Sequence, residues 1–339
     1  MNVIELHQPV WDGLQARREQ LPHALLLVGQ KGLGKYELAK QFAASLLCES
    51  PEPHGLACGK CLACNWYSQG NHPDFRLLQP DALNEEAEAE EGKKKLSQQI
   101  TIDQVRGMDE FLTVGTHRGG LRIVIVNPTE AMNRSTANAL LKTLEEPGPS
   151  TLFLLVSSEP MRLLPTIRSR CQVVPVPIPS AKRAAKILAE AGLADAGRWL
   201  ALAGGSPILA LEFSRSGETA WLEILIKRLS AGKATDPLGS ASEIEKLIKE
   251  AKGKLLLKHV VEAIQKWLVD LTLAKNTMPV RYFLPQATTI SGLADMIPAM
   301  RLINAYRDMI SNRQECEQPV NPRLFLEGLF LDYRALFNS

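Results

Sequence analysis

A glycine-rich loop that contains a lysine is the first feature of this sequence that could bind a phosphate group. Residues 29–36 read GQKGLGKY, which matches the pattern G-x-x-x-x-G-K-[ST] except at its last position. In such loops, backbone N–H groups close around phosphate oxygens, and the N-terminus of the following helix adds positive potential. The sequence therefore predicts a phosphate-binding loop that uses Gly29, Gly32, Gly34 and Lys35.

The last position of this loop argues against hydrolysis. A Ser or Thr there normally gives its hydroxyl to Mg²⁺, but this chain has Tyr36. A tyrosine hydroxyl stands much further from the backbone and cannot make that bond. We therefore expect weak binding of ATP or none, and no hydrolysis of ATP by this chain.

A second segment also lacks the groups that hydrolysis needs. Residues 121–126 form an apolar, β-branched run, which is typical of a buried parallel strand. In phosphate-loop ATPases such a strand ends in an Asp that holds Mg²⁺ and a Glu that polarises the attacking water. Here Asn127 and Pro128 stand at these positions. Glu130 comes two residues later, and nothing in the sequence places its carboxylate at the γ-phosphate.

Four cysteines have the spacing of a metal site. Cys58, Cys61 and Cys64 follow one another at C-x-x-C spacing, and Cys48 precedes them in the chain. A tight C-x-x-C turn returns the second sulfur to the side of the first, and four thiolates complete the tetrahedron that structural zinc prefers. We expect a closed zinc knuckle within residues 48–64, with an iron–sulfur cluster as the alternative.

The composition is that of an ordinary globular protein with two or three domains. The chain has 339 residues, of which 45% are apolar and 22% charged, and its formal net charge is +2. No apolar stretch is long enough to span a membrane, and the first residues lack the pattern of a signal peptide. We expect a cytoplasmic protein, in which the six cysteines favour metal binding over disulfides.

The elements that position these groups change in type along the chain. As far as about residue 176, apolar runs alternate with helical runs, which predicts a mostly parallel sheet covered by helices. The strands are expected at residues 25–28, 75–78, 122–126, 152–156 and 172–176. Prolines then mark a boundary, and only helical periodicity follows. The predicted fold class is therefore α/β followed by all-α.

One segment of the first part has no apolar face to bury. Residues 81–95 read DALNEEAEAEEGKKK, a low-complexity run of acidic residues and lysines. Such a composition cannot contribute to a core, so we expect a mobile loop inserted in the α/β part.

Several motifs resemble those of the clamp-loader branch of the AAA+ ATPases. They are the cysteine cluster and the runs LPHALLL at 21–27, NALLKTLEEP at 138–147, SRC at 169–171 and NPRL at 321–324. The resemblance covers nearly the whole chain. It implies an AAA+ phosphate-loop domain with the zinc knuckle at 1–177, a small helical lid at 178–218, and a helical collar for oligomerisation at 219–339.

The resemblance also assigns a role to an arginine. In this family the arginine of the Ser-Arg-Cys motif is an arginine finger, which reaches into the ATP site of a neighbouring subunit. Carried over, this residue is Arg170, whereas Arg168 does not hold the motif position. A guanidinium suits the role because it is planar, permanently charged and able to bind two phosphate oxygens. Active members also have a lid arginine after Gly-Ser-x, where this chain has Ile208.

The function that the resemblance implies is that of a non-hydrolysing clamp-loader subunit of DNA polymerase III, without catalysis of its own. Its implied partners are the motor (gamma or tau) and delta subunits and, through the assembly, the sliding clamp and primed DNA, with no membrane. Structural zinc is the expected cofactor. The first alternative is an ATP-hydrolysing motor subunit or another active AAA+ ATPase, which Lys35 and the loop glycines favour.

The second alternative is a zinc protein whose knuckle binds nucleic acid. Such a role calls for basic and aromatic side chains around the cysteines. The segment offers only Lys60, Trp66 and Tyr67, and we expect the two aromatic residues to pack beneath the knuckle.

Overall fold

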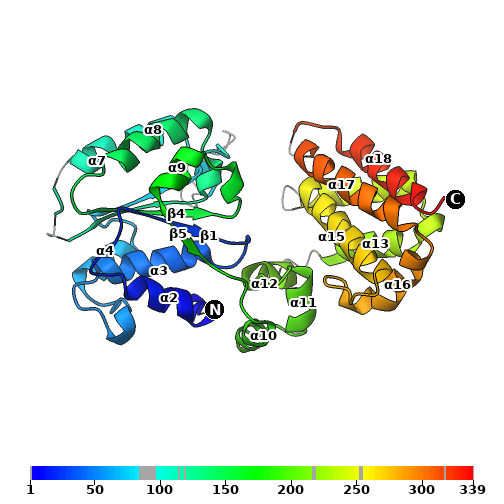
Figure 1. Cartoon of the computed structure of the whole chain (residues 1–339), viewed down its shortest axis with the longest axis horizontal. Coiled ribbons are helices and arrows are strands. Elements are labelled where there is room, and N and C mark those ends of the chain that lie inside the picture. The colour runs from blue at the N-terminus through cyan, green and yellow to red at the C-terminus, as the bar shows by residue number, and fades with distance from the viewer. Residues whose placement is uncertain are drawn as a thin grey trace. The chain divides into compact units, whose positions relative to one another are not determined.

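The computed structural model describes residues 2–83, 97–113, 115–117, 120–215, 219–251, 255–316 and 318–338. The chain forms two compact units, Met1–Ile187 and Leu188–Ser339. The first unit contains a sheet with helices, and the second is helical (Figure 1). The predicted fold class, α/β followed by all-α, is confirmed. The division into three domains stays a prediction, and the expected mobile loop at 81–95 lies outside the described residues from residue 84 onward.

A parallel five-stranded sheet forms the centre of the first unit, with the strand order β2-β3-β4-β1-β5. Every strand begins and ends within about one residue of its predicted position, because buried parallel strands appear in a sequence as short apolar runs. The strands are β1 (Ala24–Val28), β2 (Phe75–Leu78), β3 (Arg122–Val126), β4 (Thr151–Ser157) and β5 (Gln172–Pro175).

Alternate side chains of the central strands enter two apolar clusters on opposite faces of the sheet. Leu25 and Leu27 of β1 pack in one cluster with Phe42, whereas Leu26 packs in the other with Leu140. Side chains of the helices α1 (Val3–Leu6), α2 (Gln8–Gln15) and α3 (Lys35–Leu47) complete the first cluster. Side chains of α6 (Ile102–Arg106), α8 (Arg134–Glu145) and α9 (Pro165–Arg170) complete the second. Helices therefore cover both faces of the sheet, as Figure 1 shows for α3 and α8.

The helices of the first unit are mostly short. The α-helices are α1 (Val3–Leu6), α2 (Gln8–Gln15), α3 (Lys35–Leu47), α4 (Leu62–Ser68), α6 (Ile102–Arg106), α7 (Asp109–Thr113), α8 (Arg134–Glu145) and α9 (Pro165–Arg170). The 3-10 turns are η1 (Pro53–Gly55), η2 (Asp81–Leu83), η3 (Thr129–Ala131) and η4 (Pro160–Arg162). Helix α10 (Ala181–Glu190) contains the division between the two units.

The second unit is built around the long helix α15 (Leu257–Lys275), whose Trp267 is fully buried. Tyr333 of the last helix donates a hydrogen bond of 2.6 Å to the carbonyl of Leu229 and accepts one of 3.1 Å from the indole of Trp267. The helices are α11 (Ala196–Leu202), α12 (Pro207–Arg215), α13 (Thr219–Ser230), α14 (Pro237–Glu250), α15 (Leu257–Lys275), α16 (Ala287–Asp295), α17 (Ala299–Glu315) and α18 (Pro322–Ala335), with 3-10 turns η5 (Gly232–Ala234) and η6 (Leu284–Gln286).

The start of the last helix follows the sequence prediction. Asn321 caps α18 by accepting hydrogen bonds from the backbone N–H groups of Arg323 and Leu324, and Pro322 occupies the first helical position. None of the described helices combines the length and the apolar character that a membrane span requires.

Candidate functional site

The carboxyl ends of neighbouring strands bring the phosphate loop next to segments far away in the sequence. The pairing of β1 with β4 sets Val28 opposite Ser157, and the pairing of β3 with β4 sets Val126 opposite Leu155. The residues that follow these three strands therefore meet at one edge of the sheet. In parallel α/β sheets this is the edge at which ligands bind.

The glycines of the loop satisfy two different steric requirements. Gly34 is the N-cap of α3 and has a φ of 85°, in the left-handed region that favours glycine. At Gly29, a Cβ atom would lie 2.4 Å from the carbonyl oxygen of Val176, so the backbones approach too closely for any side chain. The geometry of the loop thus agrees with a phosphate-binding loop at the N-terminus of a helix.

Lys35 does not extend from this loop into solvent. The residue is only 4% exposed, and its Nζ donates to the carbonyl of Gln30 at 2.8 Å and to the hydroxyl of Ser158 at 3.0 Å. Burial lowers the pKa of Lys35 to about 8, although Glu130 and Glu37 oppose this shift. The lysine that would bind a phosphate is therefore bound by groups of the protein itself.

Glu130 is a member of this site that the sequence analysis did not anticipate. It lies in η3, and its Oε1 accepts a hydrogen bond of 2.9 Å from the backbone N–H of Ser158, the residue that also contacts Lys35. The neighbouring Asn127 and Pro128 stand where an ATPase has its two acidic residues. The one signal for Glu130 in the sequence was an acidic residue in the segment that follows β3. Its approach to the loop depends on the pairing of β3 with β4.

Tyr36 is used in packing. Its ring lies against the apolar cluster formed by α1, α2, α3 and the sheet, with the ammonium group of Lys40 4.6 Å from the ring centre. Burial raises the pKa of Tyr36 to about 12, so the phenol is neutral at ordinary pH.

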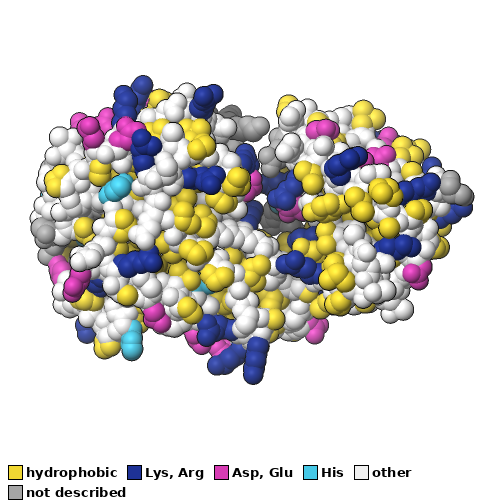
Figure 2. Space-filling view, viewed as in Figure 1, with side chains coloured by type: hydrophobic (Ala, Val, Ile, Leu, Met, Phe, Trp, Pro, Cys, Tyr) yellow, Lys and Arg dark blue, Asp and Glu magenta, His cyan; other side chains and the backbone are white. Residues whose placement is uncertain are grey.

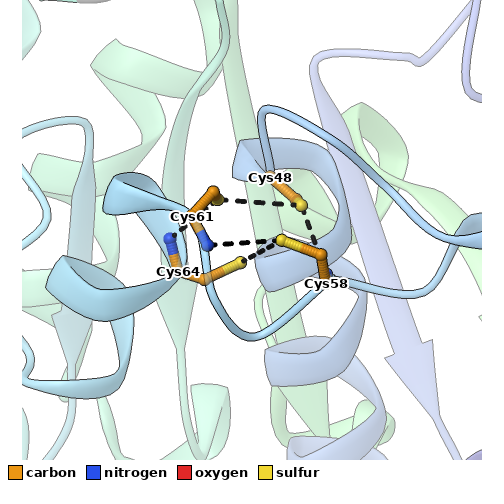
Figure 3. Close-up of side chains that lie close together, drawn as sticks. All are labelled: Cys48, Cys58, Cys61 and Cys64. Atoms are coloured by element: carbon orange, nitrogen blue, oxygen red, sulfur yellow. Dashed lines mark hydrogen bonds between the residues drawn. The ribbon is translucent and has the colours of Figure 1, made fainter.

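The four cysteines form one cluster (Figure 3), in which all the sulfur atoms lie within 4.8 Å of one another. The Sγ atoms of Cys48 and Cys61 are 3.9 Å apart, and those of Cys58 and Cys64 are 4.0 Å apart. Sulfurs that bind one ion at about 2.3 Å in a tetrahedron are separated by about 3.8 Å. The cluster therefore has the size and the donor set of a tetrahedral four-thiolate zinc site.

Local structure holds the thiols in place. Cys48 is the C-cap of α3, and Cys61 is the N-cap of α4, where it accepts from the N–H of Cys64 at 3.4 Å. The N–H of Cys58 donates to Cys48 at 3.3 Å. Burial alone would raise the pKa of Cys61, but backbone N–H donors from Cys64 and Glu49 help to lower it to about 6, which favours the thiolate that a metal requires.

The two aromatic residues beside the cluster contribute to packing. The hydroxyl of Tyr67 donates to the carbonyl of Lys40 at 2.9 Å, and its ring contacts Phe75 with centres 4.7 Å apart. The ring of Trp66 contacts that of His72, with centres 6.2 Å apart. These contacts tie α4 to α3 and β2.

Arg170 is the last residue of α9, on a different element from the loop and the cysteines. Its Nη2 lies 2.6 Å from Oε1 of Glu145, the last residue of α8, and its Nη1 donates to the carbonyl of Thr166 at 2.9 Å. The arginine side chain is 34% exposed, so part of the guanidinium faces solvent. Cys171, the next residue, is buried, and burial raises its pKa to about 11. Ile208 lies in α12 of the second unit.

Comparisons with known proteins agree with these motifs. Residues 11–179 match the family model described as DNA polymerase III, delta subunit. A protein of Pseudomonas aeruginosa named DNA polymerase III subunit delta' is 43% identical over 221 residues, which cover 64% of this chain and 62% of that protein. The chain belongs to the delta-prime family. An Escherichia coli protein with the same name is 39% identical over 151 residues, 44% of this chain and 41% of that protein.

The matched stretch thus spans between 41% and 62% of the length of these two delta-prime relatives. Among solved structures, a DNA polymerase III gamma subunit-related protein from Thermotoga maritima aligns over 97% of this chain and 99% of its own, with 16% identity and a TM-score of 0.45. A structural likeness at that level carries no conclusion about function.

Proposed function

We propose that this chain is a non-hydrolysing subunit of a bacterial clamp loader, within the DNA polymerase III assembly that replicates DNA. It would assemble with motor (gamma or tau) and delta subunits and help to load the sliding clamp on primed DNA. In this proposal the chain performs no catalysis alone, and Arg170 acts as an arginine finger on the ATP of a neighbouring motor subunit.

The observation that carries the proposal is the state of the phosphate loop in a member of the delta-prime family. Lys35 is bound by Gln30 and Ser158, the Mg²⁺-binding hydroxyl is replaced by Tyr36, and the β3 segment continues with Asn127 and Pro128. Hydrolysis of a nucleoside triphosphate needs the metal, its ligands and a group that orients water. This chain lacks the residues that would bind the metal and the residue that would orient the water.

Two further features support the remaining parts of the proposal. The partly exposed Arg170 supplies the charge and the planar donor set that a transferring phosphate requires. The cysteine cluster fits a structural zinc ion, which would hold the α3–α4 connection and leave no open position for catalysis. In this proposal Arg170 serves a neighbouring site and the zinc ion supports the local fold, so neither takes part in a reaction of this chain.

Helix α17 supports the expected role in oligomerisation. Four of its large apolar residues are exposed by 38 to 67% and recur every three or four positions, so they share one face of the helix: Met300, Ile303, Tyr306 and Ile310. Hydrophobic side chains are visible on the surface of the helical unit in Figure 2. An apolar helix face of this kind suits burial against a partner helix.

Co-purification with motor and delta subunits tests the proposal, followed by an ATPase assay of the isolated chain and of the complex. We expect one stable complex that hydrolyses ATP, and an isolated chain whose turnover equals the background. Lys35→Ala should leave the isolated chain unchanged, because there is no turnover to lose. Failure to form the complex under conditions in which motor and delta subunits assemble would refute the proposal.

A second candidate is an ATP-hydrolysing clamp-loader subunit. The left-handed Gly34 at the start of α3 favours it, because this geometry is that of a working phosphate loop. Metal-dependent turnover by the isolated chain that Lys35→Ala abolishes would establish this candidate and exclude the first.

A further inference from the structure

Glu145 and Arg170 form an ion pair between the last residues of two helices, with Nη2 and Oε1 2.6 Å apart. We propose that Glu145 is a positioning residue for Arg170: it holds the guanidinium in the orientation in which the arginine acts on the phosphates of a neighbouring subunit. The inference rests on the proposed trans action of Arg170. It adds the residue that orients the arginine.

The geometry of the guanidinium supports this role. The carboxylate of Glu145 forms an ion pair with one terminal nitrogen, and the carbonyl of Thr166 accepts a hydrogen bond of 2.9 Å from the other. These two contacts, at different nitrogens, restrict both the position and the plane of the guanidinium. An arginine has five N–H donors in a rigid fork, so the remaining donors stay available for phosphate oxygens. The 34% exposure of the side chain agrees with this division.

Both anchors belong to parts of the fold that cannot shift freely. Leu140 and Leu144 of α8 pack in the same buried cluster as Ile167 of α9. Thr166, the second anchor, lies on α9 itself one turn before Arg170. The separation between the helix ends that carry Glu145 and Arg170 is therefore set by the core of the first unit.

Stability of the helix does not account for a glutamate at this position. A carboxylate in the last turn of a helix lies at the negative end of the helix dipole, where an acidic group is unfavourable. An exposed ion pair contributes little to folding in return. Glu145 and Arg170 side chains are 48% and 34% exposed, so this pair belongs to that class. We therefore attribute the glutamate at this position to orientation of the arginine.

Orientation matters because an arginine loses much rotational freedom when it binds. A free side chain would have to be ordered at each encounter with the neighbour's nucleotide, whereas a held side chain is ordered in advance. Small errors in the position of a catalytic group reduce the rate strongly. Loss of Glu145 should therefore lower kcat in the complex and leave the affinity for ATP nearly unchanged.

The experiment measures DNA- and clamp-stimulated ATPase of the reconstituted complex with Glu145→Ala, Arg170→Ala and the double variant. We expect Glu145→Ala to lower kcat about two- to fivefold, the range of an exposed ion pair, with little change in KM. The double variant should match Arg170→Ala alone, because Glu145 acts only through the arginine. Glu145→Asp should recover part of the loss. The neighbouring exposed Glu146 provides the matched control, Glu146→Ala, which should equal the unmodified complex.

The outcomes separate this inference from the function on which it rests. Glu145 is not a positioning residue if Arg170→Ala lowers kcat but Glu145→Ala does not. The same conclusion follows if the double variant shows the product of the two losses. In both cases the proposed trans action of Arg170 is retained. If Arg170→Ala has no effect, the trans role and the inference both fail. Thermal unfolding and assembly of each variant show whether a lower rate comes from misfolding instead.

Discussion

The ammonium nitrogen of Lys35 lies 3.0 Å from the hydroxyl oxygen of Ser158, a residue 123 positions later in the chain. The backbone N–H of Ser158 in turn donates to Glu130 at 2.9 Å. These contacts connect the segments that follow β1, β3 and β4. In an active phosphate loop the lysine binds the β- and γ-phosphates, whereas here protein oxygens take its hydrogen bonds. The loop thus keeps the form of a nucleotide site while its lysine is engaged internally.

The pH dependence of stability tests this environment of Lys35. Its pKa is about 8 in the folded chain and about 10.5 when exposed. Between these values the unfolded chain binds more protons than the folded chain, so the contribution of Lys35 to the free energy of unfolding rises with pH. We expect Lys35→Met to remove a rise of roughly 1–2 kcal/mol between about pH 8 and about pH 10.

Urea unfolding at both pH values, followed by circular dichroism, measures this rise. The exposed Lys142 of α8 provides the control, and Lys142→Met should leave the difference between the two pH values as in the unmodified chain. Parallel pH curves for Lys35→Met and the unmodified chain would show that the lysine is solvated in solution.

The cysteine cluster should contain one zinc ion per chain. Four sulfurs within 4.8 Å match a closed thiolate site, so elemental analysis of the purified chain should find zinc near stoichiometry. Cys61→Ser should lower the zinc content well below one ion per chain. Cys316→Ser, which changes a buried cysteine of the helical unit, should not. Iron with sulfide, or no metal in freshly purified protein, would contradict the zinc assignment.

Removal of the metal should loosen only the region around the knuckle. A closed site contributes directly to local folding, so chelation should speed hydrogen exchange at residues 50–67. The strands of the sheet should exchange as slowly as before. Uniform acceleration through the first unit would instead mean that the metal supports the whole fold.

Asp270 should contribute strongly to the stability of the helical unit. It is fully buried, and its carboxylate accepts hydrogen bonds from the backbone N–H groups of Arg281, Tyr282 and Phe283 at 2.7 to 3.2 Å. Asp270→Ala leaves these buried donors without their acceptor, so the free energy of unfolding should fall by about 3 kcal/mol. Urea unfolding measures the change, with the exposed Asp295→Ala as control. Equal midpoints for both variants would contradict this account.

The features that were predictable from the sequence are those fixed by local pattern. Strands such as β3 can be recognised in the sequence because both faces of a parallel sheet are buried, which favours a short, nearly continuous apolar run. All five residues of RIVIV are buried. The cysteine cluster is visible because C-x-x-C spacing determines the turn that joins its sulfurs. In both cases, the residues that carry the signal lie close together in the sequence.

The features that were not predictable depend on how distant elements pack. Glu130 reaches the loop segment only because β3 and β4 pair in a particular register. Glu145 meets Arg170 only because α8 and α9 share one apolar cluster. Neither contact leaves a periodic or spacing signal in the sequence, since each joins residues 25 or more positions apart.

Arg170 should control the rate of ATP hydrolysis in the assembled complex without affecting the fold. Its side chain is partly exposed and its ion pair with Glu145 is of the weak, exposed class, so Arg170→Ala should fold and assemble normally. Arginine fingers contribute roughly 10³–10⁵ in rate at a single site. Because one site among several would lose its finger, the stimulated ATPase of the complex should fall severalfold rather than vanish, and clamp loading should fall with it.

The substitution Arg170→Lys tests the chemistry of the same position. An ammonium cannot bind two phosphate oxygens in the planar manner of a guanidinium, so lysine should restore little of the lost rate. Arg168→Ala, on the same helix, is the matched control and should leave hydrolysis unchanged, because Arg168 contacts the sulfur of Met161 at 3.5 Å and does not hold the motif position. If both Arg170 variants match the unmodified complex in stimulated ATPase and in clamp loading, the trans action fails. Arg170 would then be a surface charge paired with Glu145.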